Sequence, residues 1–146
     1  MNITSKSKEE TQEIAEKFAK DLKGGEVLCF YGNLGTGKTT FIQGLAKGLE
    51  IKQNITSPTF VLMKKYRSKK QEARIKNLNF YHLDCYRLGS VEEAQDLGIE
   101  EIWDDKKNVI AIEWADKIND ILPKERVDIC FEHVDENKRK ITIFKG

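Results

Sequence analysis

The stretch GNLGTGKT at residues 32–39 constrains the fold more than any other part of the chain. It follows the apolar run 26–31 (EVLCFY), which is typical of a strand buried on both faces of a sheet. After the stretch, apolar residues recur at helical spacing as far as residue 49. The residues expected on the inward face of that helix are Phe41, Ile42, Leu45, Ala46 and Leu49. A strand, a glycine-rich loop and a helix in this order form a P-loop and favour an α/β fold.

The residue types of this loop suit the binding of a triphosphate. Glycines tolerate backbone angles that let successive N–H groups face one anion, and the following helix adds its positive amino-terminal end. Lys38 supplies a charge for the β- and γ-phosphates, and the Thr39 hydroxyl is a hard oxygen ligand suited to Mg²⁺. Proteins that bind guanine usually carry an NKxD element. The nearest strings, KIND (117–120) and DDKKN (104–108), do not match it, which favours ATP.

Two carboxylates are candidates for the metal and the catalytic centre. Asp84 ends the run NFYHLD and Glu113 ends the run NVIAIE. Both are expected at the carboxyl edge of the sheet, where ligands bind in such folds and where P-loop proteins place an acidic residue near the metal. The alternative for each is an ordinary solvent-facing carboxylate at a strand end. His82, two residues before Asp84, fits either a packed strand histidine or a neighbour of Asp84 on the same face.

The rest of the chain predicts further strands and one more long helix. Ser7 and Glu10 have capping-box spacing before a helix expected over 8–22, with Ile14, Phe18 and Leu22 as its buried stripe. Strands expected over 60–66 and 76–84 form one hairpin, and alternating residues after 127 form a second. The sequence therefore predicts a P-loop NTPase-like, three-layer αβα fold with a mixed, partly parallel central sheet, as a single domain over residues 1–146.

Composition limits the partners of the chain. It has 25 Lys and Arg against 24 Asp and Glu, so there is no strong electrostatic attraction to nucleic acid or to a membrane surface. No apolar stretch approaches the roughly 20 residues of a membrane span. The three cysteines, Cys29, Cys85 and Cys130, are far apart and form no CxxC pair, which favours neither a disulfide framework nor a zinc site. These features predict a cytoplasmic protein.

Four motifs together resemble one family. The segments YGNLGTGKTTF, SPTF, YHLDCYRL and IEW occur in the order and approximate spacing of the TsaE (YjeE) family, from about Thr4 to the strand at Val127. The resemblance implies a protein that binds ATP with Mg²⁺ and hydrolyses it weakly when alone. It also implies action on the TsaB and TsaD proteins in the formation of N6-threonylcarbamoyladenosine at position 37 of tRNAs that read ANN codons. The charge balance suggests that tRNA is contacted only indirectly or weakly.

The resemblance also implies roles for particular residues. Thr39 and Glu113 would bind Mg²⁺, Asp84 would be the acidic residue at the catalytic centre, and Thr11 would lie near the nucleotide base. The phosphates would be held by Leu34, Gly35, Thr36, Gly37, Lys38 and Thr39.

Outside the phosphate and metal site, the resemblance implies two further regions. The switch loop would be Ser57–Phe60. Trp114, Tyr86 and Arg87 would lie near a mouth of the site that faces the partner proteins.

Two other functions remain open from the residues. A small-molecule P-loop kinase would usually carry an arginine-rich lid, whereas this chain has five arginines and little length for an acceptor site. A nucleotide sensor without catalysis is less consistent with an intact Lys38, Thr39 and two candidate carboxylates. No residue is an obvious guide for the attacking water, which predicts slow hydrolysis by the chain alone. Lys38 is expected to face solvent when no nucleotide is bound.

Overall fold

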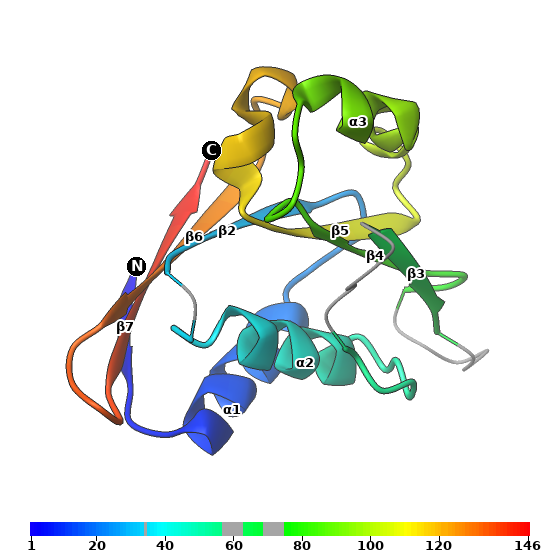
Figure 1. Ribbon diagram of the computed structural model, residues 1–146. Helices are drawn as coiled ribbons and strands as arrows, with labels where there is room; N and C mark the ends of the chain where they lie inside the picture. Colours follow the sequence, from blue (N-terminus) through cyan, green and yellow to red (C-terminus); the bar gives the residue numbers. More distant parts are fainter. Residues whose placement is uncertain (34, 57–62, 69–74) are drawn as a thin grey trace.

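The computed structural model describes residues 1–33, 35–56, 63–68 and 75–146 (Figure 1). Its strands form one mixed sheet of seven in the order β1-β7-β6-β2-β5-β4-β3. The strands are β1 (Asn2–Ser5), β2 (Val27–Tyr31), β3 (Met63–Arg67), β4 (Asn79–Asp84), β5 (Asn108–Glu113), β6 (Val127–His133) and β7 (Arg139–Lys145). The strands β6, β2, β5 and β4 are parallel, while β1, β7 and β3 pair antiparallel with their neighbours.

Helical segments cover both faces of the sheet (Figure 1). On one face lie α1 (Lys8–Ala19) and α2 (Lys38–Gly48). On the other lie α3 (Val91–Asp96) and the 3₁₀ segments η1 (Ile99–Ile102) and η2 (Ala115–Ile121). Because the central strands are covered on both sides, β5 is buried along its whole length, as its continuous apolar pattern predicts. The predicted three-layer α/β fold with a mixed sheet is confirmed.

An aromatic cluster joins the P-loop helix to the sheet. The rings of Phe30 on β2, Phe41 on α2 and Phe131 on β6 have centroids 5.5 to 6.1 Å apart. Phe30 and Phe41 are fully buried, and Phe131 is nearly so. Large buried rings of this kind contribute strongly to core stability. The cluster therefore anchors the strand before the phosphate loop and the helix after it to one rigid core.

Helix α1 differs in detail from its sequence pattern. Ser7 caps it as predicted, since its side chain accepts a hydrogen bond of 3.0 Å from the Glu10 N–H. The helix ends at Ala19, however, and its buried face is Thr11, Ala15 and Ala19. The predicted stripe was wrong for Ile14 and Phe18, which are half-buried at the edge of the core. The smaller residues face inward because α1 lies very close to α2.

The contact between α1 and α2 depends on two glycines of α2. A Cβ atom at Gly44 would lie 2.5 Å from the Gln12 carbonyl oxygen and 2.8 Å from the Ala15 Cβ. A Cβ at Gly48 would lie 2.6 Å from the Glu16 carbonyl oxygen. These neighbours are mainly backbone, which cannot turn aside as a flexible side chain can. Glycine at both positions is therefore a requirement of the close helix packing.

We expect Gly44→Ala to destabilise the protein by about 1–3 kcal/mol, the usual cost of overpacking. The direction of this change in stability is informative, because replacing glycine by alanine in a helix interior normally stabilises the helix by about 1 kcal/mol. Urea unfolding followed by circular dichroism measures the difference. Glu13→Ala, at an exposed position of α1, is the control and should stay within about 0.5 kcal/mol of the unchanged chain. A Gly44→Ala variant of equal or higher stability would contradict this account of the packing.

Two strands differ from their predicted extents. β1 was not predicted, because its four residues are mostly polar and it is an edge strand that pairs only with β7. The strand predicted over 76–84 begins at Asn79. Of the strand predicted over 60–66, residues 60–62 lie outside the described residues, and β3 continues to Arg67. The antiparallel pairing of β3 with β4, and of β6 with β7, confirms both predicted hairpins.

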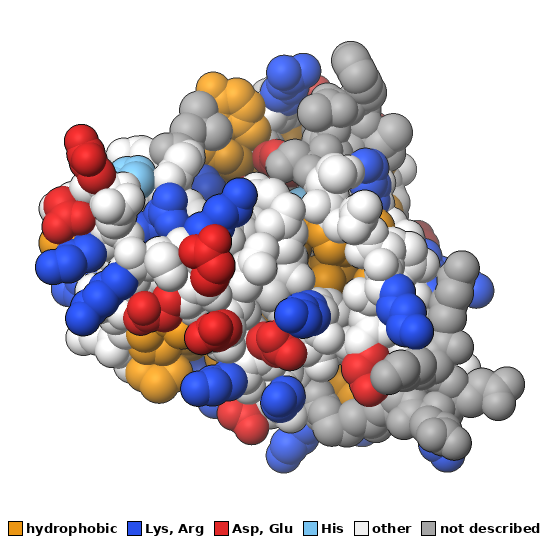
Figure 2. Space-filling model, turned by 90° about the horizontal axis from the view of Figure 1, so that it is seen from below, with side chains coloured by type: hydrophobic (Ala, Val, Ile, Leu, Met, Phe, Trp, Pro, Cys, Tyr) orange, Lys and Arg blue, Asp and Glu red, His pale blue; other side chains and the backbone are white. Residues whose placement is uncertain are grey.

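On the face formed by the two long helices, the described side chains of both charge types are mixed. Figure 2 shows Lys and Arg side chains interspersed with Asp and Glu side chains over that face. This agrees with the near balance of the two charge types in the sequence. None of the helices in the described part of the chain has both the length and the apolar character that crossing a bilayer requires.

Candidate functional site

The candidate site lies where three neighbouring parallel strands end. β2 leads into the glycine-rich loop, β4 ends at Asp84 and β5 ends at Glu113. The strand register places Asp84 directly beside Glu113 and Glu113 beside Phe30 of β2. Both carboxylates therefore occupy the carboxyl edge of the sheet, as predicted from their positions after apolar runs. A cavity of about 380 Å³ opens there, with Gly35, Gly37, Lys38 and Thr39 on one side of it.

The loop presents its backbone toward this cavity. Gly35 and Gly37 have φ angles of 77° and 102°, which side chains other than glycine rarely allow. Gly37 is the N-cap of α2 and has no side chain that could cap the helix. The amino terminus of a helix favours an anion, because its N–H groups and its dipole point there. Leu34, also predicted to hold phosphate, lies outside the described residues.

Thr36 has an internal role in the loop. Its side chain is buried, and its hydroxyl donates a hydrogen bond of 2.7 Å to the Asn33 carbonyl. Its backbone N–H bonds to the same carbonyl at 3.3 Å. Thr36 therefore shapes the turn, while the neighbouring Gly35 and Gly37 line the cavity.

Lys38 does not face solvent in this structure, so that expectation was wrong. Its side chain is folded back, with the ammonium donating to the Gly32 carbonyl and lying 3.9 Å from the centroid of the Trp114 ring. Only 4% of the residue is exposed. Burial lowers the pKa of Lys38, and the charges of Glu113 and Asp84 oppose that shift only in part. The lysine is therefore held in the cavity wall, close to the two carboxylates.

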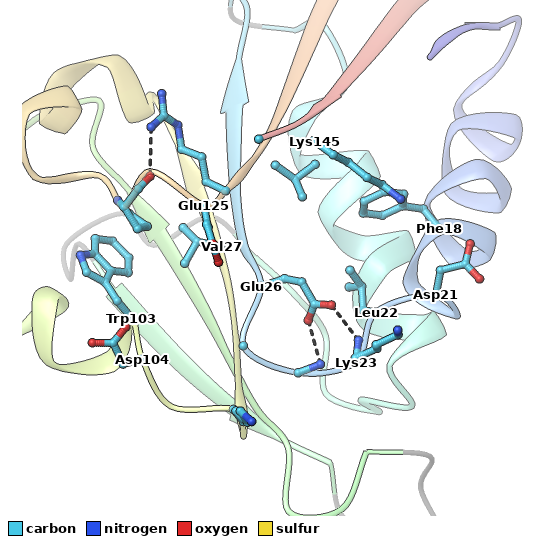
Figure 3. Close-up of a pocket in the computed structure, with 17 residues that line it drawn as sticks. Phe18, Asp21, Leu22, Lys23, Glu26, Val27, Trp103, Asp104, Glu125 and Lys145 are labelled. Atoms are coloured by element: carbon cyan, nitrogen blue, oxygen red, sulfur yellow. Dashed lines mark hydrogen bonds between the residues drawn. The ribbon is translucent and has the colours of Figure 1, made fainter.

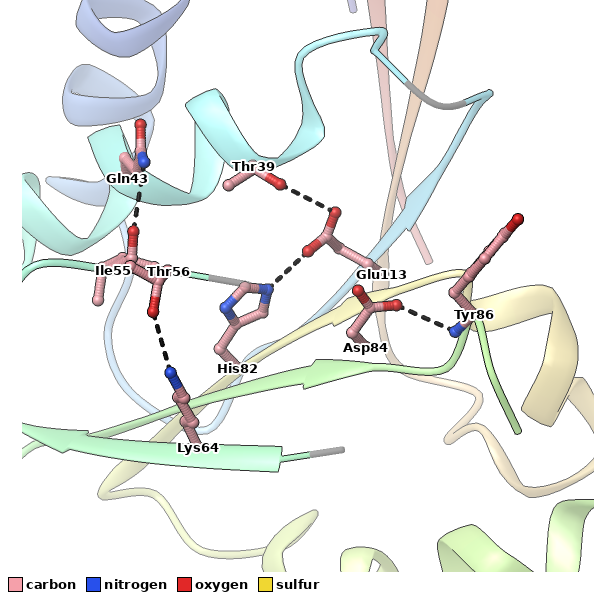
Figure 4. Close-up of polar contacts among 9 residues, drawn as sticks. All are labelled: Thr39, Gln43, Ile55, Thr56, Lys64, His82, Asp84, Tyr86 and Glu113. Atoms are coloured by element: carbon pink, nitrogen blue, oxygen red, sulfur yellow. Dashed lines mark hydrogen bonds and ion pairs between the residues drawn. The ribbon is translucent and has the colours of Figure 1, made fainter. Parts of the chain in front are cut away.

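Glu113 is the centre of a short chain of polar contacts (Figure 4). Its Oε1 accepts a hydrogen bond of 3.3 Å from the Thr39 hydroxyl at the start of α2. Its Oε2 lies 2.7 Å from Nε2 of His82 on β4. The carboxylate and the histidine are almost completely buried. The structure thus joins two residues that the sequence singled out, Thr39 and Glu113, and adds His82 as a direct neighbour.

Asp84 faces the same cavity from the end of β4. Its Oδ1 accepts a hydrogen bond of 3.0 Å from the backbone N–H of Tyr86. Burial raises the pKa of the Asp84 carboxyl, and this hydrogen bond works against the rise. Arg87, which the resemblance places near the mouth of the site, is exposed.

The donor set of this site fits a magnesium ion. The Thr39 hydroxyl and the Glu113 carboxylate are hard oxygen ligands that already lie within 3.3 Å of each other. The described residues contain no group of three or more His, Cys, Asp or Glu side chains placed to hold a metal by themselves. This matches the usual habit of Mg²⁺, which is held by one or two protein oxygens together with phosphate and water. Thr39 and Glu113 are thus the residues suited to hold it, with Asp84 nearby.

Two aromatic side chains form one wall of the cavity. The rings of Tyr86 and Trp114 have centroids 5.1 Å apart, and Tyr86 is 46% exposed. Trp114 has a φ of 57°, in the left-handed region that is uncommon for a side chain of this size. Such strain persists only where the surrounding structure enforces it, and it is frequent at functional sites. The exposed Tyr86 and the half-buried Trp114 thus line the cavity together, with Trp114 in contact with Lys38.

The structure adds two basic residues to the cavity and leaves Thr11, like Thr36, out of its lining. Lys8, at the start of α1, and Arg139, at the start of β7, line the cavity. The Arg139 Nε is buried without a hydrogen-bond partner among the described residues. Sequence reasoning missed both, because they come from elements far from the loop in the chain. Thr11 does not line the cavity; it is buried, and its hydroxyl contacts Ser5 and the carbonyl of Ser7.

The proposed switch loop, Ser57–Phe60, lies outside the described residues. The described residues nearest to it are Thr56 before it and Met63 after it. Gln43 of α2 donates a hydrogen bond of 3.2 Å to the Ile55 carbonyl, and Lys64 of β3 donates one of 2.9 Å to the Thr56 hydroxyl (Figure 4). The segment that leads into the loop is therefore attached both to the P-loop helix and to the edge of the sheet.

A larger cavity, of about 620 Å³, lies at the amino-terminal edge of the sheet (Figure 3). Two of its charged side chains, Glu26 and Arg126, already have partners. Glu26 accepts hydrogen bonds of 2.7 Å from the backbone N–H groups of Lys23 and Gly24, and Arg126 bonds to Asp128. It has neither a glycine-rich loop nor the amino terminus of a long helix among its lining residues. The smaller cavity is therefore the better candidate for a nucleotide site.

The fold and the site together define a P-loop protein of the α/β class. A model of the family "Threonylcarbamoyl adenosine biosynthesis protein TsaE" matches residues 5–141. The chain is 40% identical over 134 residues to the tRNA threonylcarbamoyladenosine biosynthesis protein TsaE of Bacillus subtilis, covering 92% of this chain and 78% of that protein. It is 36% identical to the protein of the same name from Aquifex aeolicus, covering 98% and 95% of the two chains. The chain belongs to the TsaE family.

A solved structure agrees with this assignment. The crystal structure of YdiB from Bacillus subtilis superimposes on this chain with a TM-score of 0.77 and 32% sequence identity. The match covers 99% of this chain and 84% of that one. The similarity therefore includes the whole sheet and the P-loop side of the molecule.

Proposed function

We propose that this protein binds and hydrolyses ATP with Mg²⁺, and that it acts on a TsaB–TsaD complex in the formation of N6-threonylcarbamoyladenosine at position 37 of tRNAs that read ANN codons. The observation that carries the proposal is the convergence of Lys38, Thr39 and Glu113 at the amino terminus of α2, beside the cavity. Membership of the TsaE family supports the pathway. The balanced surface charge supports docking to proteins more than direct binding of tRNA.

The residues of the cavity have complementary tasks in this proposal. Backbone N–H groups of the loop and the ammonium of Lys38 hold the phosphates, and Lys8 and Arg139 add positive charge nearby. Thr39 and Glu113 hold the metal, which when bound neutralises charge on the β- and γ-phosphates. Asp84 faces the reacting end of the cavity. Phosphoryl transfer needs position and charge more than covalent help, and this set supplies both.

The resting position of Lys38 supports slow hydrolysis by the protein alone. Its ammonium contacts the Gly32 carbonyl and the Trp114 ring, and these contacts have to be exchanged for phosphate contacts. Tyr86 and Trp114 at the mouth are exposed enough for a partner to touch. A partner that moves Trp114 would release Lys38 toward the nucleotide. The contacts that restrain the lysine therefore support activation by a docked partner.

We expect phosphate release from ATP to be slow for the protein alone and to rise at least about tenfold when the TsaB–TsaD complex of the same organism is added; a tenfold rise is a barrier change of about 1.4 kcal/mol. A colorimetric phosphate assay measures it. The complex alone and the complex with a Lys38→Met variant are the controls. No rise, with ATP still bound, would contradict partner activation and favour a sensor. A phosphorylated small molecule in place of free phosphate would identify a kinase.

A further inference from the structure

His82 is a buried polar residue whose place in the site the phosphate loop does not explain. It lies on β4, opposite Ala111 of β5, and is 0% exposed. Its Nε2 lies 2.7 Å from Glu113 Oε2. Phe80, two residues earlier on the same strand, is a fully buried apolar side chain. Packing alone would thus be satisfied by an apolar residue at position 82. What the histidine adds is its contact with the Glu113 carboxylate.

The hydrogen-bond pattern indicates which nitrogen of His82 carries the proton. Nδ1 is buried and has no hydrogen-bond partner among the described residues. A proton on Nδ1 would leave a buried donor without an acceptor and would turn the lone pair of Nε2 toward the carboxylate. A proton on Nε2 instead gives a hydrogen bond from His82 to Glu113. We therefore assign the donor to Nε2.

The consequence for Glu113 is a fixed orientation. Oε2 is occupied by the His82 donor, so Oε1 is the oxygen turned toward Thr39 and the cavity. Without that hydrogen bond the carboxylate is free to rotate about its terminal torsion, which is broad for glutamate. Partners that fix a ligand in this way typically change metal affinity by 10- to 100-fold.

We propose that His82 is a positioning residue that holds Glu113 Oε1 toward Thr39 and thereby sets the affinity of the site for the divalent cation. The inference rests on the proposed function, since it requires Glu113 to be a metal ligand. It assigns His82 no contact with the nucleotide. The variants of His82 are therefore expected to separate cation affinity from nucleotide affinity.

Two polar substitutions of similar size test the geometry. The amide of His82→Gln reaches about as far as Nε2 does and keeps a donor for Glu113, whereas the amide of His82→Asn ends near the position of Nδ1 and falls short. Leu83→Ala is the control for lost stability, because Leu83 is a fully buried neighbour that packs in the core on the other face of the sheet. Circular dichroism and thermal melting establish that each variant is folded.

The measurement is Mn²⁺ binding in the presence of a non-hydrolysable ATP analogue, followed by electron paramagnetic resonance. We expect His82→Asn to weaken Mn²⁺ binding about 10- to 100-fold, with His82→Gln within about threefold of the unchanged protein. Binding of the analogue without metal should be the same in all variants. The proposal is overturned if His82→Asn binds Mn²⁺ as tightly as the unchanged protein does. It is also overturned if Leu83→Ala weakens Mn²⁺ binding as much as His82→Asn does while the two variants are equally stable. If the unchanged protein binds neither the analogue nor Mn²⁺, the proposed function fails, and the inference fails with it.

Discussion

Lys38→Met is expected to lower ATP turnover by at least about 100- to 1,000-fold, the usual effect of removing one group that stabilises charge in the transition state. Methionine keeps most of the length of the side chain and removes only the ammonium. Without the ammonium, the phosphates can still bind the backbone N–H groups of the loop, but they lose their contact with the positive charge of Lys38. Phosphate release, measured with the TsaB–TsaD complex present, gives the effect. Lys47→Met is the matched control, since Lys47 belongs to the same helix but has a 72% exposed side chain.

The same variant should keep or raise the stability of the protein. Burial lowers the pKa of Lys38, so the folded state disfavours its charged form relative to the unfolded chain. This penalty is fully present below the folded-state pKa of Lys38 and fades as pH rises from there toward the ordinary lysine pKa of 10.5. Thermal melting of the two proteins should show a difference that shrinks at alkaline pH. Full turnover by Lys38→Met would remove the P-loop from the mechanism.

Glu113→Gln is expected to raise the Mg²⁺ concentration that gives half-maximal turnover. Loss of a residue that only supports a metal ligand typically weakens metal affinity by roughly 10- to 100-fold, and we expect a larger change here because Glu113 is itself the proposed ligand. The substitution removes a charge that sits within 3.3 Å of the Thr39 hydroxyl, while leaving the shape of the side chain. Its amide oxygen can still accept from His82, so the fold should be kept. A Mg²⁺ titration of phosphate release measures the shift.

Asp84→Asn is the companion variant, because Asp84 lies beside Glu113 in the strand register. If Asp84 acts at the catalytic centre and Glu113 binds the metal, Asp84→Asn lowers the maximal rate with a smaller change in the Mg²⁺ midpoint. An unchanged titration for Glu113→Gln would mean that the wrong carboxylate has been assigned. Glu113→Ala is less useful, since it also leaves the buried His82 donor unpaired, at a cost of about 1–3 kcal/mol.

The sequence predicted the parts of the site that depend on local patterns. The glycine-rich loop requires a strand before it and a helix after it, so β2 and α2 follow directly. Asp84 and Glu113 were found because each ends an apolar run, and the ends of parallel strands share one edge of the sheet. The cap at Ser7 was found in the same way, from the spacing of two residues.

The rest depends on contacts between distant parts of the chain. The closeness of α1 and α2 shifts the buried face of α1 from Ile14 and Phe18 toward Ala15, because Ala15 lies against Gly44 of α2. Arg139 reaches the loop through the position of β7 in the sheet, and no local pattern gives strand order. The conformation of Lys38 is set by Gly32 and Trp114 together, and the pairing of a lysine with one particular aromatic ring has no sequence signal.

The buried charges at the carboxyl edge of the sheet also couple ligand binding to folding. Burial raises the pKa of Asp84 and lowers the pKa of Lys38, so in both cases the folded protein disfavours the charged form. Ligands that bring opposite charges relieve both penalties at once and bind the folded chain alone. By mass action, a ligand at 100 times its dissociation constant adds about 2.7 kcal/mol to the free energy of unfolding. Under the proposed function, the free protein is therefore expected to melt at a lower temperature than the protein with ATP and Mg²⁺.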